Sequence, residues 1–127
     1  MKVLIDTHAL IWWFGEPNHL SKRAAAIIAH PDNTVLVSPA IAWEMAIKIN
    51  LGKLDALPLL AELSRHIEEE GFVEQPINLE QAGRAGLLPL HHRDPFDRLL
   101  VAQAQSLSVP ILSADTVLDK YDVKRLW

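Results

Sequence analysis

Short runs of apolar residues recur along the chain, each closed by a polar or turn-forming residue. Three of them, Lys2–Ile5, Thr34–Val37 and Val109–Leu112, are rich in Val, Ile and Leu. Short apolar runs bounded by turn residues are typical of buried strands. Phe72–Gln75 and Val123–Leu126 predict two further short strands.

The longer segments between these runs predict helices that are closed by glycine or proline. Ser38 before Pro39 combines a capping hydroxyl with a preset φ, which is a favourable helix start, and Asp94 before Pro95 repeats the pattern. The predicted helices are Thr7–Phe14, Leu20–Ala29, Pro39–Asn50, Leu57–Glu70, Leu79–Leu87 and Pro95–Leu107.

Alternation of strands and helices predicts an α/β fold. The strands are apolar throughout rather than half polar, which favours a mainly parallel sheet of four to five strands covered by helices on both faces. The length of 127 residues fits one domain spanning 1–127, without repeats or long linkers.

Composition narrows the class of protein. The apolar fraction of 50% and the charged fraction of 22% are ordinary for a globular domain. The absence of cysteine excludes a disulfide scaffold and a thiolate zinc site, and the apolar stretch Ala9–Phe14 is too short to cross a bilayer. We therefore expect a cytoplasmic protein that does not enter a membrane. The formal charge of −4 by itself disfavours a nucleic-acid partner.

Four acidic residues follow or precede the predicted strands where a site is expected. Asp6 directly follows the first strand and Asp115 follows the third long one. Glu44 lies in the second turn of one helix and Asp97 in the first turn of another. Ligands of parallel α/β sheets bind outside the carboxyl ends of the strands. These four carboxylates can therefore converge on one edge.

Such a cluster repels itself unless cations bind. Oxygen ligands favour Mg²⁺ or Mn²⁺ over zinc, and these ions lower the pKa of a water and stabilise charge on a leaving oxygen. Phosphodiester hydrolysis is the chemistry that suits the arrangement best. The four carboxylates also account for the whole formal charge of −4, so the acidic balance is compatible with a nucleic-acid substrate.

Most of these acids also have a purely structural interpretation. Asp94 is well placed as a helix cap, and Asp97 three residues later suits the helix dipole. Glu44 and Lys48 have the spacing of a solvated ion pair, although the neighbours of Glu44 are largely apolar. Asp115 can cap a short helix. These alternatives stay open from sequence alone.

Other chemistry-bearing residues have simpler explanations. Asp6 is the acid that is hardest to explain structurally, because a carboxylate ending a buried strand is costly unless it is capped or used. The pair His91 and His92 lies in a polar turn and is interpreted as solvated. Trp12, Trp13 and Trp43 are interpreted as core or interface residues rather than base-stacking platforms.

Four stretches of the chain resemble the motifs of VapC-type PIN domains. In order along the chain they are MKVLIDTHALIW with Asp6 and Thr7, SPAIAWEMAIKINLGKL with Glu44, HHRDPFDRLLVAQA with Asp97, and ILSADTVLDKY with Asp115. The third stretch is the most specific. The resemblance covers the whole chain, with Asp94 as an additional acid in the third motif.

The resemblance implies a three-layer α/β/α fold and an Mg²⁺- or Mn²⁺-dependent endoribonuclease. It also implies the toxin of a type II toxin–antitoxin pair, a homodimer and a cognate antitoxin. Asp6, Glu44, Asp97 and Asp115 would hold the metal and carry catalysis. The supporting residues would be Thr7, Asp94 and Ser113, and the predicted RNA contacts are Lys48, Arg93 and Arg98.

Three other classes of protein are alternatives to this interpretation. An aspartyl-phosphate hydrolase typically has a second acid two residues after the first, whereas His8 stands there. A receiver-type domain needs clustered acids after the first strand and a lysine after a late strand, and neither is evident. The remaining alternative is a catalytically inactive PIN-like module that binds RNA or protein.

Overall fold

Five parallel strands form one sheet at the centre of the protein. The computed structural model describes residues 1–127, and its strand order is β3-β2-β1-β4-β5. The strands are β1 (Lys2–Ile5), β2 (Thr34–Val37), β3 (Val73–Glu74), β4 (Ile111–Leu112) and β5 (Arg125–Leu126). All four neighbouring pairs are parallel, which confirms the predicted sheet type.

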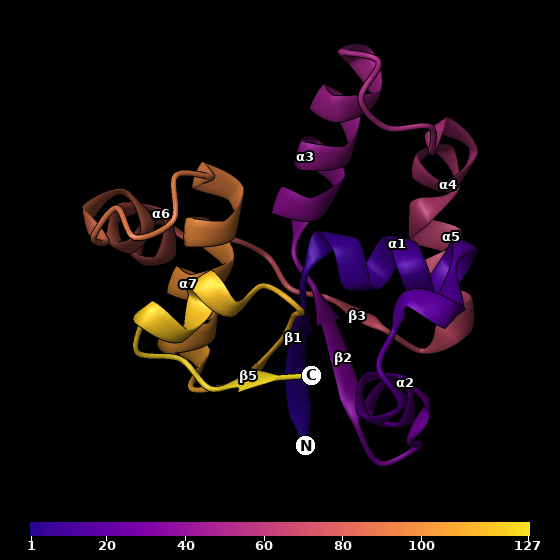
Figure 1. Ribbon diagram of the computed structural model, residues 1–127, viewed down its shortest axis with the longest axis horizontal. Helices are drawn as coiled ribbons and strands as arrows, with labels where there is room; N and C mark the ends of the chain where they lie inside the picture. Colours follow the sequence, from indigo (N-terminus) through magenta and orange to yellow (C-terminus); the bar gives the residue numbers. More distant parts are fainter.

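Helices cover both faces of the sheet and give the expected three layers. The α-helices are α1 (Thr7–Gly15), α2 (Lys22–Ala29), α3 (Pro39–Asn50), α4 (Leu57–Ala61), α5 (Leu63–Glu70), α6 (Leu79–Leu87) and α7 (Pro95–Leu107). Two short 3₁₀ helices are η1 (Pro17–His19) and η2 (Thr116–Lys120). In Figure 1, α6 and α7 lie to the left of the strands and α1, α2, α4 and α5 to the right.

The order in which successive strands are added across the sheet reverses at β1. From β1 the crossovers lead to β2 and β3 on one side, whereas β4 and β5 lie on the other. The carboxyl ends of β1 and β4 therefore flank the switch point, where parallel α/β folds bind ligands. Backbone hydrogen bonds join the two strands there, from the Leu4 N–H to Pro110 O at 2.9 Å and from the Asp6 N–H to Leu112 O at 3.1 Å.

The core explains why these segments fold together. Val3, Leu4 and Ile5 have no exposed surface, and together with β2, β4 and the inner faces of α1, α3 and α7 they belong to a cluster of 24 buried apolar residues. No helix in the structure combines the length and the apolar character that a bilayer crossing requires.

Several element boundaries differ from the sequence predictions, and the strands predicted at Phe72–Gln75 and Val123–Leu126 each keep only two residues. The segment Leu57–Glu70 is two helices, because the backbone leaves helical geometry at Glu62 (φ −113°, ψ 17°). The bend allows both segments to turn leucines toward the core, with Leu63 buried. The strand predicted at Val109–Leu112 is shortened to its last two residues, since Pro110 has no N–H to donate to a ladder.

Helix caps fix the remaining boundaries. The helix predicted from Leu20 begins two residues later, where the Ser21 hydroxyl accepts the Ala24 N–H at 2.9 Å. The capping hydroxyl of Ser38 accepts the Ala40 N–H at 3.1 Å, as the sequence predicts. Gly71 ends α5 at φ 75°, a left-handed conformation that favours glycine.

A buried amide pair joins α7 to the segment between β3 and α6. Gln103 has no exposed surface, and its Nε2 donates to the carbonyl of Gln75 at 3.4 Å, to the carbonyl of Pro76 at 3.3 Å and to Gln81 Oε1 at 3.3 Å. Gln81 also caps α6 through a reciprocal pair of hydrogen bonds with Asn78.

Gln103→Ala is expected to lower the free energy of unfolding by about 1–3 kcal/mol, because buried acceptors lose their donor. Urea denaturation followed by circular dichroism measures the change. Gln105→Ala, on the same helix but with one long contact to Asp122 O at 3.4 Å, is the matched control and is expected to change stability by less than about 0.5 kcal/mol. Equal effects of the two substitutions would contradict this role of Gln103.

Candidate metal and nuclease site

Asp6 occupies the end of β1 and begins α1. Its Oδ1 accepts the Ala9 N–H at 2.9 Å, so the carboxylate caps the helix, and the residue is only 5% exposed. Burial raises the pKa of Asp6 above its usual value, although hydrogen bonds from Ser113 and the Ala9 N–H act in the opposite direction. Each carboxylate oxygen has two lone pairs, so these hydrogen bonds leave lone pairs of Asp6 available to a ligand.

Glu44 is buried on α3 with a partner at each oxygen. The Thr7 hydroxyl donates to Oε1 at 2.6 Å, and the Lys48 ammonium donates to Oε2 at 2.5 Å. The i, i+4 pair predicted from spacing is therefore present, but its acid is 2% exposed rather than solvated. Burial lowers the pKa of Lys48, but the hydrogen bond and the negative charge of Glu44 outweigh this effect, so the pKa of Lys48 is raised overall.

The third motif places two acids at the start of α7. Asp94 accepts the Phe96 N–H at 2.8 Å, which confirms it as the helix cap. Asp97 lies in the first turn with its side chain 18% exposed. Burial and the charge of Asp94 raise the pKa of Asp97 to about 7, while His92 acts in the opposite direction.

Asp115 is the most exposed of the four acids. Its Oδ1 accepts the Val117 N–H at 3.0 Å and caps η2, as the structural interpretation allowed. Its own N–H donates to the Ser113 hydroxyl at 3.0 Å, so Ser113 fixes the turn that leads from β4 to the acid. Asp6 and Asp115 line the same pocket of about 280 Å³, together with His8, Trp12 and Ala114.

His92 is a site residue that the sequence analysis missed. The interpretation of His92 as solvated was wrong, because its side chain is 16% exposed and its Nε2 lies 2.6 Å from Asp115 Oδ2 and 3.1 Å from Asp97 Oδ2. His91 is exposed and packs its ring edge against Tyr121. A histidine two residues before a helix-capping Asp-Pro is the only signal in the sequence that could have pointed to this site.

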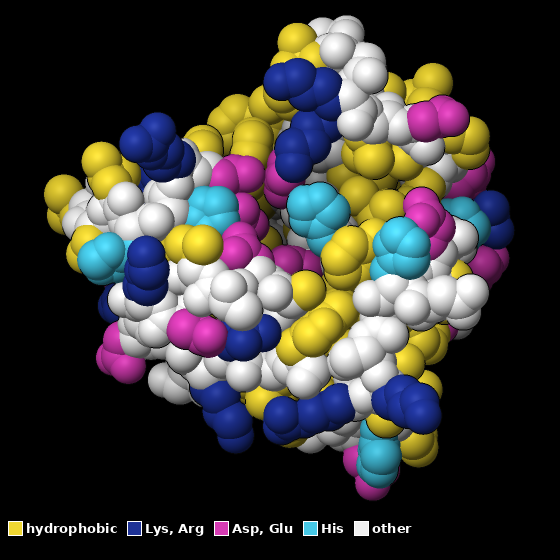
Figure 2. Space-filling model, in the orientation of Figure 1, with side chains coloured by type: hydrophobic (Ala, Val, Ile, Leu, Met, Phe, Trp, Pro, Cys, Tyr) yellow, Lys and Arg dark blue, Asp and Glu magenta, His cyan; other side chains and the backbone are white.

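The structure brings all four predicted acids together. The charges of Glu44 and Asp6 each raise the pKa of Asp97, and the charge of Glu44 also raises the pKa of Asp6. Asp115 and Asp97 both lie next to Nε2 of His92. Figure 2 shows Asp and Glu side chains gathered around a hollow near the middle of one face, with His and Lys or Arg side chains on its rim.

The predicted RNA-contact residues divide into two groups. Arg93 is exposed beside the acids. Lys48 forms an ion pair with Glu44, and the Arg98 Nη1 donates to the carbonyl of His92 at 2.9 Å. These two side chains therefore hold site residues in place as well as adding positive charge. Trp43 is 61% exposed and packs its edge on Phe96, so it is not a core residue.

The side chains fit a divalent cation. Asp97 and Asp115 each place a carboxylate oxygen within 4.8 Å of the other, beside a ring nitrogen of His92. The raised pKa values of Asp6 and Asp97 show that buried negative charge in this site lacks compensation. Carboxylate oxygens without any thiolate are the ligands that Mg²⁺ and Mn²⁺ prefer.

Larger cavities lie away from this chemistry. One of about 470 Å³ is lined by residues before β4 and β5, including Pro110 and Lys124. Another of about 460 Å³ lies between α1 and α4, lined by residues that include Phe14 and Pro58. Neither contains any of the four acids.

Comparison with known proteins agrees with the fold and motifs. The family model of the PIN domain matches residues 3–124. "Ribonuclease VapC22" of Mycobacterium tuberculosis is 35% identical over 108 residues, which cover 80% of this chain and 78% of that protein.

Solved structures with similar folds come from toxin–antitoxin complexes. VapBC-1 from nontypeable Haemophilus influenzae superposes with a TM-score of 0.70 at 15% identity, covering 99% of this chain and 97% of that one. VapBC2 from Rickettsia felis, bound to a promoter DNA fragment, gives a TM-score of 0.68 at 11% identity, covering 99% and 98%. At these identities the likeness concerns the fold. Because the PIN-domain model matches residues 3–124, the chain belongs to the PIN-domain family.

Proposed function

We propose that this protein is a metal-dependent endoribonuclease and the toxin of a toxin–antitoxin pair. The observation that carries the proposal is the convergence of Asp6, Glu44, Asp97 and Asp115 at the switch point of the sheet. The similarity to a protein named as a ribonuclease supports the activity, and the toxin–antitoxin structures with the same fold support the role.

Asp6, Asp97 and Asp115 are the proposed direct ligands of Mg²⁺ or Mn²⁺. Each has at least one carboxylate lone pair that no protein donor occupies. Glu44 has a protein donor at each oxygen and its charge is already paired with the Lys48 ammonium, so we propose that it contacts the cation through water. A bound divalent cation supplies an acidified water and neutralises charge that develops on the phosphate and the leaving oxygen.

The remaining side chains position these acids and the RNA. Thr7 holds Glu44, Ser113 holds the turn before Asp115, and Asp94 starts the helix that carries Asp97. Exposed Arg93 is the proposed contact to an RNA phosphate, and Lys48 and Arg98 add positive charge behind the acids. Phosphate contacts of this kind position RNA without reading its sequence.

A cognate antitoxin and a second copy of the chain are the proposed protein partners. Trp43 and Leu51 are each 61% exposed on or next to α3, and Ile47 between them is 36% exposed. An apolar stripe of this kind supports a protein contact. A cytoplasmic location remains a prediction.

Cleavage of a mixed RNA pool tests the proposed activity. Purified protein is expected to cut RNA with Mn²⁺ or Mg²⁺ and to lose the activity in EDTA. Without a cation, the negatively charged carboxylates repel the negatively charged phosphate. Restoring the cation in excess is the control for reversible loss. Cleavage that is unchanged in EDTA would refute the metal mechanism, and absence of both cleavage and Mn²⁺ binding would favour a binding module instead.

A further inference from the structure

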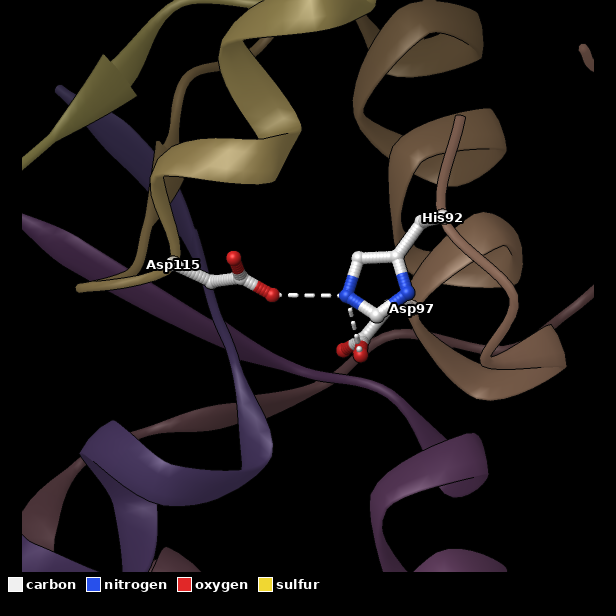
Figure 3. Close-up of side chains that lie close together, drawn as sticks. All are labelled: His92, Asp97 and Asp115. Atoms are coloured by element: carbon white, nitrogen blue, oxygen red, sulfur yellow. Dashed lines mark hydrogen bonds and ion pairs between the residues drawn. The ribbon is translucent and has the colours of Figure 1, made fainter. Parts of the chain in front are cut away.

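His92 lies between two of the proposed ligands. Figure 3 shows its imidazole with one nitrogen facing both Asp97 and Asp115, which come from separate parts of the chain. Asp97 belongs to α7, whereas Asp115 follows β4. The same ring has a third contact, since its Nδ1 accepts the backbone N–H of Asp94 at 3.1 Å.

The contact with Asp94 fixes where the imidazole carries its proton. A backbone N–H can only donate, so Nδ1 of His92 must present a lone pair. In the neutral ring the proton then resides on Nε2. Nε2 therefore donates to Asp115 Oδ2 at 2.6 Å, and it lies 3.1 Å from Asp97 Oδ2.

Both the backbone and the ring of His92 are held in place. Its N–H donates to the Tyr121 hydroxyl at 2.9 Å, and the same hydroxyl donates to the carbonyl of Pro89. Its carbonyl accepts Arg98 Nη1 at 2.9 Å. The imidazole is thus anchored before any ligand arrives, which reduces the ordering that binding requires.

This arrangement is the reverse of that of a metal-binding histidine. A coordinating imidazole offers a bare nitrogen to the cation and donates its other N–H to an acceptor. Coordination through Nε2 of His92 would place a proton on Nδ1, directly against the Asp94 N–H. The proximity of His92 to two carboxylates therefore does not make it a third ligand.

We propose that His92 is a positioning residue that bridges Asp97 and Asp115, with its Nε2–H donated to Asp115 and its ring in close contact with Asp97, and that it does not bind the cation itself. The inference rests on the proposed cation site and specifies how that site is assembled. The hydrogen bond to Asp115 and the close contact with Asp97 hold the two carboxylates near one point. Asp115 Oδ2 retains a second lone pair for coordination, and the lone pairs of Asp97 Oδ2 also remain available.

Nitrogen NMR of the metal-free protein tests the bridge directly. Long-range ¹H–¹⁵N correlation spectra are expected to show His92 with protonated Nε2 and bare Nδ1. A protonated Nδ1 on His92 would overturn the proposal. This measurement needs neither cation nor RNA, so it separates a failure of the bridge from a failure of the proposed function.

Mn²⁺ binding to two substitutions tests the consequence. His92→Phe keeps the size of the ring but removes the donor, and Mn²⁺ affinity by calorimetry is expected to fall about 10-fold, as is typical when a partner of a ligand is lost. His92→Gln places an amide N–H near the position of Nε2 and is expected to restore affinity to within about threefold. His91→Phe, at the adjacent exposed histidine, is the matched control and is expected to bind as the wild type does.

Pulsed electron paramagnetic resonance of bound Mn²⁺ distinguishes a bridge from a ligand. The proposal expects no directly coordinated ¹⁴N in the wild type. A nitrogen coupling that disappears in His92→Gln would overturn it, because His92 would then be a ligand. Unchanged or tighter Mn²⁺ binding by His92→Phe would also overturn it, since the imidazole would then be dispensable or would compete with the cation.

Discussion

Asp6→Asn is expected to reduce RNA cleavage by about 10³-fold, which corresponds to about 4 kcal/mol of transition-state stabilisation. The asparagine side chain can still accept the Ala9 N–H, so the cap of α1 is retained while the negative charge is lost. The charge matters because Asp6 is buried at the switch point and shares its pocket with Asp115. Single-turnover cleavage of a short RNA with saturating Mn²⁺ measures the effect.

Asparagine is a sharper substitution than alanine at this position. Asp6→Ala would also remove a helix cap, which typically costs about 1 kcal/mol of stability. Asp32→Asn changes an exposed acid far from the carboxylate cluster and is the matched charge control. Wild-type cleavage by a folded Asp6→Asn protein would exclude Asp6 from the mechanism.

Asp97→Asn is expected to stabilise the metal-free protein at neutral pH while greatly reducing metal-dependent stabilisation. The pKa of Asp97 is about 7 in the folded state, against 3.8 for the ordinary group. The folded protein therefore retains this proton between pH 4 and pH 7 while the unfolded chain releases it. The contribution of Asp97 to stability falls as pH rises through that window and is lowest above pH 7.

Asparagine removes this penalty because it carries no charge at any pH. In EDTA the gain in free energy of unfolding is expected to be about 1 kcal/mol at pH 5 and to reach about 2–4 kcal/mol at pH 8. Urea denaturation at the two pH values measures it. An equal effect at both pH values, or a loss of stability at pH 8, would contradict the raised pKa of Asp97.

The sign reverses when the cation is present. Saturating Mn²⁺ is expected to stabilise the wild type by about 2.7 kcal/mol at a concentration 100 times its dissociation constant, and to stabilise Asp97→Asn much less. The same residue then destabilises the empty protein and stabilises the loaded one. This trade is typical of functional sites, where a charge is retained for binding at the expense of stability.

The sequence alone determined most of the architecture of this protein. Apolar runs closed by turn residues located the strands, and Ser38-Pro39 and Asp94-Pro95 located two helix starts. These signals are local, because a cap or a proline acts on the backbone within one turn. The order of the four acids relative to the strands was equally local, and the parallel sheet then required them to face one edge.

Tertiary structure decided which side chains meet and how each acid is used. Thr7 and Glu44 are 37 residues apart and His92 and Asp115 are 23 apart, yet each pair is joined by a 2.6 Å hydrogen bond. The break at Glu62 was likewise set by packing, because both parts of that segment turn leucines toward one core. Periodicity describes the face that a residue occupies on its own element. Contacts, burial and the resulting pKa of Asp97 depend on how separate elements pack together, so only the folded molecule determines them.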